Sequence, residues 1–270
     1  MELLNLTAVH FGLQKGNLIS AFPTFEPLMS IAAGLDCEWL QVPVDKYYRH
    51  DLDALEAQIN SETRLVYICN PNNPTGTLLK PELLRDFCQR VSKKVPVFVD
   101  EAYTEFLTQP EVNTMIPLIK EGHNLIVAKT FSKIHGFAGL RVGYALALPE
   151  TLKEMQKYRR YETTLAGPTL KAAITSYQDQ SFIDHCRKKN EAARNYTAET
   201  LKAMGYDPVP SYTSFMIFPI KMEPKQLIKD MRAQGVGIRS WTFAERNWCR
   251  VSIGTMEEMK IFTEALKTLS

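Results

Sequence analysis

The chain has 270 residues, of which 45% are hydrophobic, so it can bury one large core or a large core and a smaller one. Its 32 basic and 30 acidic residues give a formal net charge of +2, which excludes a general electrostatic attraction to nucleic acid or to a membrane surface. Five cysteines without metal-type spacing indicate neither a metal site nor a disulfide framework, and favour a reducing, cytoplasmic compartment.

Apolar runs alternate with amphipathic stretches through the first two thirds of the chain. Strands are predicted at 17–22, 37–44, 64–70, 95–103 and 124–132. Stretches such as 80–94 predict helices between several of them, which is the pattern of a parallel sheet covered by helices. The run at 142–148 follows too closely for a crossover helix, so it is expected to pair antiparallel.

The pattern becomes mostly helical from about residue 150. Helices are predicted at 149–161, 181–204, 224–234 and 256–269, and strands at 214–220, 236–240 and 249–253. The predicted fold class is therefore α/β, with a mostly parallel sheet covered by helices and a smaller C-terminal α+β domain. We expect a large domain over 1–178 and a small domain over 179–270.

Polar motifs follow three of the predicted parallel strands. "NPNNPTG" occupies 70–76, "DEAY" occupies 100–103 and "TFSK" occupies 130–133. Taken alone, "NPNNPTG" is equally well an ordinary turn, since Asn, Pro and Gly are common turn residues. Because the carboxyl ends of parallel strands meet at one edge of a sheet, the three motifs are expected to converge on one crevice. An amide, a carboxylate with a phenol three residues later, and a lysine flanked by hydroxyls suit an aldehyde cofactor that contains a pyridine ring.

These motifs, with "TFSKIHGFAGLRVGY" at 130–144, resemble the pyridoxal-phosphate enzymes of the aspartate aminotransferase fold (fold type I, class I/II), and most of all the histidinol-phosphate aminotransferases. The resemblance covers nearly the whole chain, from "FPTF" to "CRVSIGT". The order of the motifs is more specific than any one of them. Asn73 precedes Asp100 by 27 residues, and Asp100 precedes Lys133 by 33.

The resemblance implies that Lys133 binds the aldehyde of pyridoxal 5'-phosphate and afterwards moves the substrate proton. This role requires an unprotonated amine, so we expect burial and neighbouring cations to lower the pKa of Lys133. Asp100 would pair with the pyridine nitrogen, and Glu101 would face the other side of the sheet. The alternative for Lys133 is an ordinary surface lysine.

The resemblance also assigns the other cofactor-binding and substrate-binding residues. Asn73 and Tyr103 would bind the phenolic oxygen of the cofactor, Thr130, Ser132 and Arg141 its phosphate, Phe25 would stack on its ring, and Arg250 and Arg239 would bind the carboxylate or phosphate of the substrate. For Phe25 and Tyr103 the alternative is an ordinary core aromatic residue. For the two arginines it is a position on the solvated surface.

The chain departs from the family in three places. It starts inside the helix that follows the phosphate-binding loop of the family, so we expect an N-terminal part to be missing, which affects cofactor affinity and dimer closure. The segment "RRYETTLAGP" at 159–168 differs from the cluster that relatives carry near the substrate. His135 is also unusual, and we interpret it as a solvated loop side chain.

The leading hypothesis is an aminotransferase that exchanges an amino group between glutamate and a keto acid or keto phosphate, with histidinol phosphate as the amino compound. Two alternatives stay open: a decarboxylase of a phosphorylated amino acid such as threonine phosphate, and a non-catalytic ligand-sensing domain of the same fold. The resemblance further implies a homodimer with the active site at its interface. Neither nucleic acid nor membrane is expected as a partner.

Overall fold

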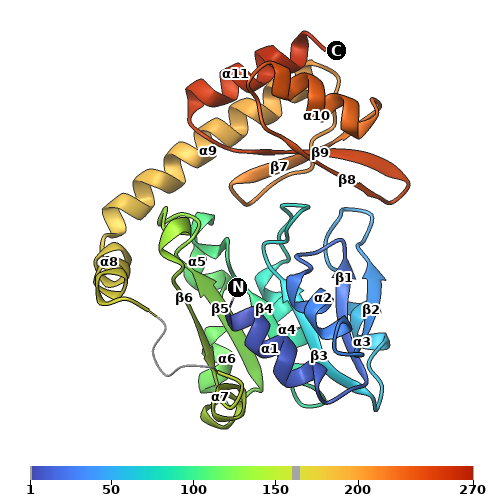
Figure 1. Ribbon diagram of the computed structural model, residues 1–270, viewed down its shortest axis with the longest axis vertical. Helices are drawn as coiled ribbons and strands as arrows, with labels where there is room; N and C mark the ends of the chain where they lie inside the picture. The colour runs from blue at the N-terminus through green and yellow to red at the C-terminus, as the bar shows by residue number, and fades with distance from the viewer. Residues whose placement is uncertain (1, 160–164, 270) are drawn as a thin grey trace.

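The computed structural model describes residues 2–159 and 165–269 and contains two separate sheets (Figure 1). The larger sheet has the order β2-β1-β3-β4-β5-β6. Its strands are β1 (Asn17–Phe22), β2 (Glu38–Pro43), β3 (Thr63–Cys69), β4 (Val97–Asp100), β5 (Leu125–Thr130) and β6 (Gly143–Ala147). The first five strands are parallel and β6 pairs antiparallel with β5, which confirms both predictions for this sheet.

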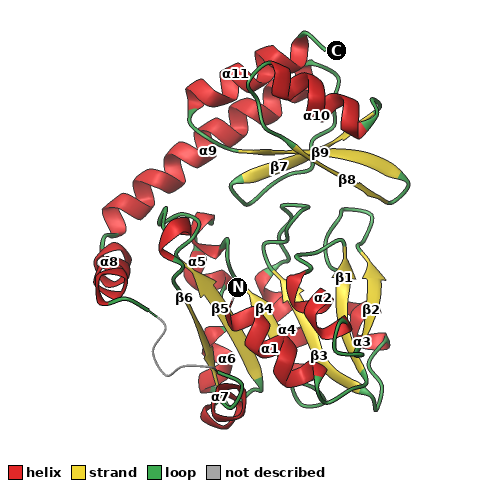
Figure 2. Ribbon diagram, viewed as in Figure 1, coloured by secondary structure: helices red, strands yellow, loops and turns green. Residues whose placement is uncertain are grey.

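Helices cover both faces of the larger sheet (Figures 1 and 2). One face packs against α1 (Glu2–Gly12), α2 (Pro27–Ala33) and α7 (Pro149–Gln156), and the other against α3 (Leu52–Ala57), α4 (Pro81–Val91) and α6 (Ile116–Lys120). The central strand β4 has no polar face because it is buried on both sides. We call residues 2–159 the large lobe.

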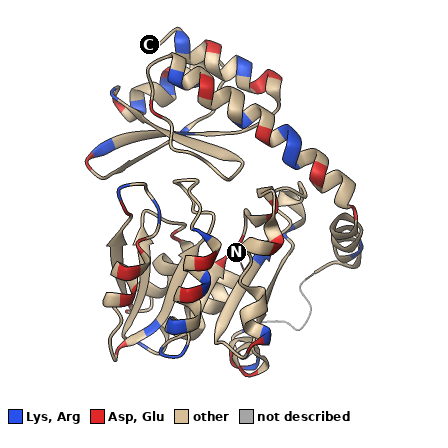
Figure 3. Ribbon diagram, turned by 180° about the vertical axis from the view of Figure 1, so that it is seen from behind, with Lys and Arg blue, Asp and Glu red and all other residues tan. Residues whose placement is uncertain are grey.

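The smaller sheet is antiparallel, with the order β7-β9-β8. Its strands are β7 (Phe215–Ile220), β8 (Arg239–Phe243) and β9 (Arg246–Ser252), and its helices are α9 (Gln180–Ala203), α10 (Pro224–Ala233) and α11 (Met256–Lys267). One face packs against these helices, as the amphipathic patterns predict. We call residues 180–269 the small lobe. Basic and acidic residues are interspersed along the chain of both lobes (Figure 3).

Short helical elements complete the chain. They are α5 (Pro110–Asn113), α8 (Gly167–Gln178) and the 3-10 turns Thr104–Phe106 and Ala138–Leu140. Asp179 separates α8 from α9 and caps α9, because its carboxylate accepts a hydrogen bond of 3.0 Å from the backbone N–H of Phe182. The proposed domain boundary at 178/179 coincides with this cap and stays a prediction. Among the described residues, no helix is both long and apolar enough to cross a membrane.

The two lobes touch through the loops that follow the parallel strands. The backbone N–H of Tyr212 donates a hydrogen bond of 2.8 Å to the carbonyl of Gly76 in the "NPNNPTG" loop. Arg187 of α9 donates from Nε to the carbonyl of Glu105 at 3.1 Å. Apolar residues from both lobes also form shared clusters, one of which joins Tyr103 to Phe215. The loops of the predicted crevice are therefore held against the small lobe.

His50, between β2 and α3, gives stability a specific pH dependence. It is 3% exposed, and neither ring nitrogen has a hydrogen-bond partner among the described residues. Burial lowers the pKa of His50 from 6.5 to about 4. The folded protein keeps the ring neutral, whereas the unfolded chain takes up a proton below pH 6.5. Stability present above pH 6.5 is therefore lost as the pH falls toward 4, by up to about 3 kcal/mol.

Urea unfolding at pH 7.5 and pH 4.5 measures this loss. We expect the wild type to lose about 2 kcal/mol more between the two pH values than His50→Leu, which cannot take up the proton. His185→Leu removes an exposed histidine of α9 and serves as the matched control. Equal losses in the wild type and His50→Leu would contradict the assignment.

Candidate active site

The site begins where three neighbouring strands end. Cys69 of β3, Asp100 of β4 and Ala128 of β5 lie side by side in the sheet, so the segments that follow them leave from one edge. The backbone N–H of Asn70 donates to the carbonyl of Asp100 at 3.0 Å. The side-chain oxygen of Asn70 accepts a hydrogen bond of 2.9 Å from the backbone N–H of Leu79. The predicted convergence of the motifs on one edge is thus observed.

The "NPNNPTG" loop is rigid because its interior polar groups are paired. Asn72 is buried, donates to the carbonyl of Pro23 at 3.1 Å and accepts a bond from the hydroxyl of Thr24 at 2.9 Å. Gly76 has a φ of 76°, and a Cβ there would lie 2.6 Å from Oγ of Ser211. With the rest of the loop fixed, Asn73 is the amide presented to the candidate site. We call the region bounded by Asn73, Asp100, Lys133 and Arg250 the cleft.

Asp100 is buried at the end of β4 with both carboxylate oxygens hydrogen-bonded. Oδ2 accepts from the hydroxyl of Tyr67 at 3.0 Å, and Oδ1 accepts from the backbone N–H of Ala102 at 3.1 Å. Burial raises the pKa of Asp100, and these two hydrogen bonds oppose the rise. Among the described residues no cation lies within ion-pair distance of this carboxylate. A partner that carries a positive charge would therefore stabilise it.

Glu101 faces away from the cleft. Its carboxylate is 1% exposed, lies 3.0 Å from Nζ of Lys129 and accepts a hydrogen bond of 2.7 Å from the backbone N–H of Met115. Lys129 also pairs with Glu105 at 2.8 Å. This buried network stabilises the far side of the sheet end, as expected from the alternation of side chains in a strand.

Lys133 and Tyr103 meet in the cleft. Nζ of Lys133 lies 5.2 Å from the centre of the Tyr103 ring, whose edge packs on Phe215 at 5.2 Å between centroids. Burial and the charges of Arg250 and Arg239 lower the pKa of Lys133, and Asp100 opposes this shift. Burial raises the pKa of Tyr103, so its phenol keeps its proton. The pKa of Lys133 is thus lowered, which is the direction expected from the sequence.

The two arginines of the small lobe lie directly opposite each other on β8 and β9. The guanidinium of Arg250 lies between two aromatic rings, 4.7 Å from that of Phe215 and 4.6 Å from that of Trp241. It donates from Nη1 to Oδ1 of Asn73 at 2.6 Å, while its buried Nε has no partner among the described residues. Arg239 is exposed beside it. This pair offers an anion several donors at the mouth of the cleft.

The proposed phosphate-binding residues are less closely assembled. Oγ1 of Thr130 accepts from the backbone N–H of Ser132 at 3.0 Å. Arg141, at a φ of 55°, is exposed and donates to the carbonyl of Ala138 at 2.7 Å. Phe25 is half-buried and packs against the core on the α1 and α2 face. Among the described residues none of these side chains contacts Lys133, so their cofactor roles stay predictions.

His135 was interpreted from the sequence as a solvated loop side chain, and this interpretation is wrong. This residue is 7% exposed, and its Nδ1 lies 2.8 Å from the hydroxyl of Ser176 on α8. Its ring also packs on Phe131 at 4.5 Å between centroids. The loop is covered by α8, which sequence patterns do not reveal. The substituted segment at 159–168 falls largely on residues 160–164, which lie outside the described residues.

Three residues of the cleft were missed: Tyr67, Phe215 and Trp241. Tyr67 precedes Cys69 by two positions in β3, so alternation along the strand could have placed it on the same face. Phe215 and Trp241 reach the cleft only because the small lobe packs over the large lobe. No local signal in the sequence marks such a contact.

The donor set fits pyridoxal phosphate. Lys133 is an amine of lowered pKa, Asp100 is a buried carboxylate without an ion pair in the described part of the chain, and Asn73 offers an amide. A protonated pyridine nitrogen would supply the positive charge that Asp100 lacks. The unpartnered Nε of Arg250 would find an acceptor in a substrate anion.

Comparison with known proteins agrees with this fit. The model of the aminotransferase class I and II family matches residues 4–266. Histidinol-phosphate aminotransferase of Brevibacillus brevis is 33% identical over 270 residues, covering 99% of this chain and 73% of that protein. The same enzyme of Moorella thermoacetica is 31% identical over 271 residues, covering 99% and 69%.

A solved structure extends the comparison to the cofactor. Histidinol-phosphate aminotransferase of Sinorhizobium meliloti in complex with pyridoxal-5'-phosphate superposes with a TM-score of 0.88 at 26% identity, covering 99% of this chain and 75% of that one. The chain therefore belongs to the class I and II aminotransferases, enzymes that depend on pyridoxal phosphate.

Proposed function

We propose that this aminotransferase moves an amino group between histidinol phosphate and 2-oxoglutarate, in either direction. The observation that carries the proposal is the facing pair Arg239 and Arg250, placed beside Lys133 and able to hold a carboxylate or a phosphate. The relatives at 31% and 33% identity support the choice of substrate.

The chemistry divides between the cofactor and the side chains. Bound pyridoxal phosphate supplies an electron sink that makes the Cα–H bond of the substrate acidic. Asp100 would hold the ring nitrogen in its protonated form, and Tyr103 and Asn73 would donate toward the phenolic oxygen. Lys133, whose pKa is lowered by burial and by the two arginines, offers a neutral amine that can take the proton from Cα. Arg250 and Arg239 would orient the substrate through its anionic group.

We also propose a homodimer located in the cytoplasm. Apolar side chains are exposed along α8 and the start of α9: Leu170, Ile174, Tyr177 and Phe182. A groove of about 600 Å³ lies beside them. Such a patch favours a second copy as its cover. All five cysteines are free, which agrees with a reducing compartment. Light scattering that gave a monomer at assay concentrations would contradict the dimer.

The test uses the protein loaded with pyridoxal phosphate. With histidinol phosphate and 2-oxoglutarate, we expect glutamate to form, and Arg239→Ala to raise the KM for histidinol phosphate by about 10-fold because a charge-assisted contact is lost. Arg232→Ala, on the exposed side of α10, is the control. Carbon dioxide release from threonine phosphate without a keto acid would favour the decarboxylase. Glutamate formed from other amino acids only would contradict the substrate.

A further inference from the structure

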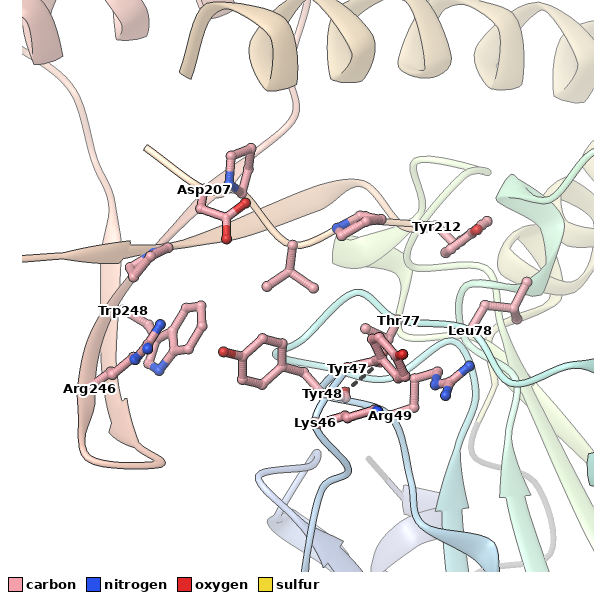
Figure 4. Close-up of a pocket in the computed structure, with 14 residues that line it drawn as sticks. Lys46, Tyr47, Tyr48, Arg49, Thr77, Leu78, Asp207, Tyr212, Arg246 and Trp248 are labelled. Carbon is pink, nitrogen blue, oxygen red and sulfur yellow. Dashed lines mark hydrogen bonds between the residues drawn. The ribbon is translucent and has the colours of Figure 1, made fainter. Parts of the chain in front are cut away.

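A second cleft lies between the lobes, apart from Lys133 and Asp100. It encloses about 410 Å³, within the usual range for small-molecule sites. Its large-lobe wall is residues 46–49 and 77–78, and its small-lobe wall is residues 207–210 with Tyr212, Pro219, Arg246 and Trp248. Figure 4 shows these side chains converging from the two lobes. We call this space the interlobe pocket.

The lining of the interlobe pocket carries more positive than negative charge. Lys46, Arg49 and Arg246 line it, against the single carboxylate of Asp207. Arg49 is neutralised by Asp45 at 2.8 Å. Neither Lys46 nor Arg246 has an ion-pair partner within the residues that the structure describes. Lys46 lies over the ring of Tyr47, with Nζ 5.1 Å from the ring centre, and Arg246 stays available to an anion that enters the pocket.

The same lining is rich in aromatic rings. Tyr48 reaches from the large lobe toward Trp248, and the two rings pack edge to face with 4.8 Å between their centroids (Figure 4). Trp248 is held by stacking on Phe243 at 4.9 Å and by a hydrogen bond from Nε1 to the Phe243 carbonyl at 3.1 Å. Tyr47 and Tyr212 are 57% and 43% exposed at the rim. Rigid rings beside unpaired cations suit a ligand that is both planar and anionic.

We propose that the interlobe pocket binds a small aromatic anion, a single or fused ring that carries a carboxylate or phosphate. Its ring would lie against Tyr48, and its anionic group would be held by Arg246, since Figure 4 shows both side chains beside Trp248. The alternative, a site for a bare anion, makes no use of the aromatic lining of the pocket.

The interlobe pocket shares structural elements with the active site. Thr77 ends the loop that presents Asn73, and its hydroxyl donates to the carbonyl of Tyr48 at 2.7 Å. Arg246, Trp248 and Arg250 occupy every second position of β9, so their side chains share one face of the strand. A ligand in the pocket would therefore bridge the lobes through the same loop and strand that carry the active site.

Phenyl phosphate is the probe, titrated by calorimetry into the protein saturated with pyridoxal phosphate. We expect Arg246→Glu to weaken binding at least about 10-fold, because an attraction becomes a repulsion, and Tyr48→Leu, which removes the ring, to weaken it several-fold. Arg232→Glu makes the same charge change on α10, outside the pocket, and is expected to change nothing. Arg250→Ala removes a proposed anion-binding residue of the active site and is expected to leave binding in the interlobe pocket intact.

Two further titrations separate the two halves of the proposed recognition. Inorganic phosphate and phenol are each expected to bind at least about 10-fold more weakly than phenyl phosphate. Binding that survives Arg246→Glu but is lost in Arg250→Ala would place the probe at the active site and overturn the proposal. Inorganic phosphate that binds as tightly as phenyl phosphate would overturn the claim that the pocket recognises the ring of the ligand. These outcomes do not depend on which amino donor the enzyme uses.

Discussion

Lys133→Ala is expected to lower amino transfer by at least about 10³-fold, because the variant loses both the covalent attachment of the cofactor and the base at the substrate Cα. The fold should not change, since the Lys133 side chain makes neither a hydrogen bond nor an ion pair with the residues that the structure describes. Stopped-flow assays of single turnovers with glutamate would measure the effect on the chemical step directly.

Lys153→Ala is the matched control, because it removes an exposed lysine of α7 far from the cleft. Its rates should equal those of the wild type. Partial rescue of Lys133→Ala by a small added amine would show that the missing group is a base. A Lys133→Ala protein with normal turnover would exclude this lysine as the base.

Asp100→Asn is expected to lower kcat at least about 10²-fold, because the neutral amide cannot keep the pyridine nitrogen protonated. Stability should change by no more than about 1 kcal/mol, since Asn has the same shape and Tyr67 can reverse the direction of its hydrogen bond. Thermal unfolding and steady-state kinetics on one preparation would measure both quantities.

Asp100→Asn removes the charge of the side chain and keeps its shape, so a lower kcat would report on the charge. Asp86→Asn, at an exposed position of α4, removes one carboxylate from the surface and should alter neither quantity. A large loss of stability in Asp100→Asn would show that the carboxylate serves to stabilise the fold. A kcat within a few-fold of the wild type would show that its charge is not needed.

Most of the fold follows from local patterns in the sequence, but the hairpin of β8 and β9 does not. Strands were predicted at 236–240 and 249–253, whereas β8 covers Arg239–Phe243 and β9 covers Arg246–Ser252. The turn between them places Ala244 and Glu245 at φ of 48° and 56°. Hairpin turns of this kind usually carry Asn-Gly or Asp-Gly, so the signal was absent and the strands were predicted too far apart.

The candidate site was predictable where a side chain follows a strand. Asn73, Asp100 and Lys133 each leave the end of a parallel strand, and topology alone brings them together. The contact of Arg250 with Asn73 depends on the packing of one lobe over the other, which no short pattern encodes. His135 was misjudged for a similar reason, because α8 covers its loop.

The central claim is that Lys133, Asp100 and the facing arginines act together on an amino donor through pyridoxal phosphate. The most direct measurement is the absorbance of the loaded protein as glutamate is added without any keto acid. The account predicts loss of the yellow absorbance of the lysine-bound cofactor, formation of an equal amount of 2-oxoglutarate, and neither change in Lys133→Ala. Protein that binds the cofactor but forms no 2-oxoglutarate with glutamate, and that keeps its yellow absorbance when histidinol phosphate is added, would contradict it.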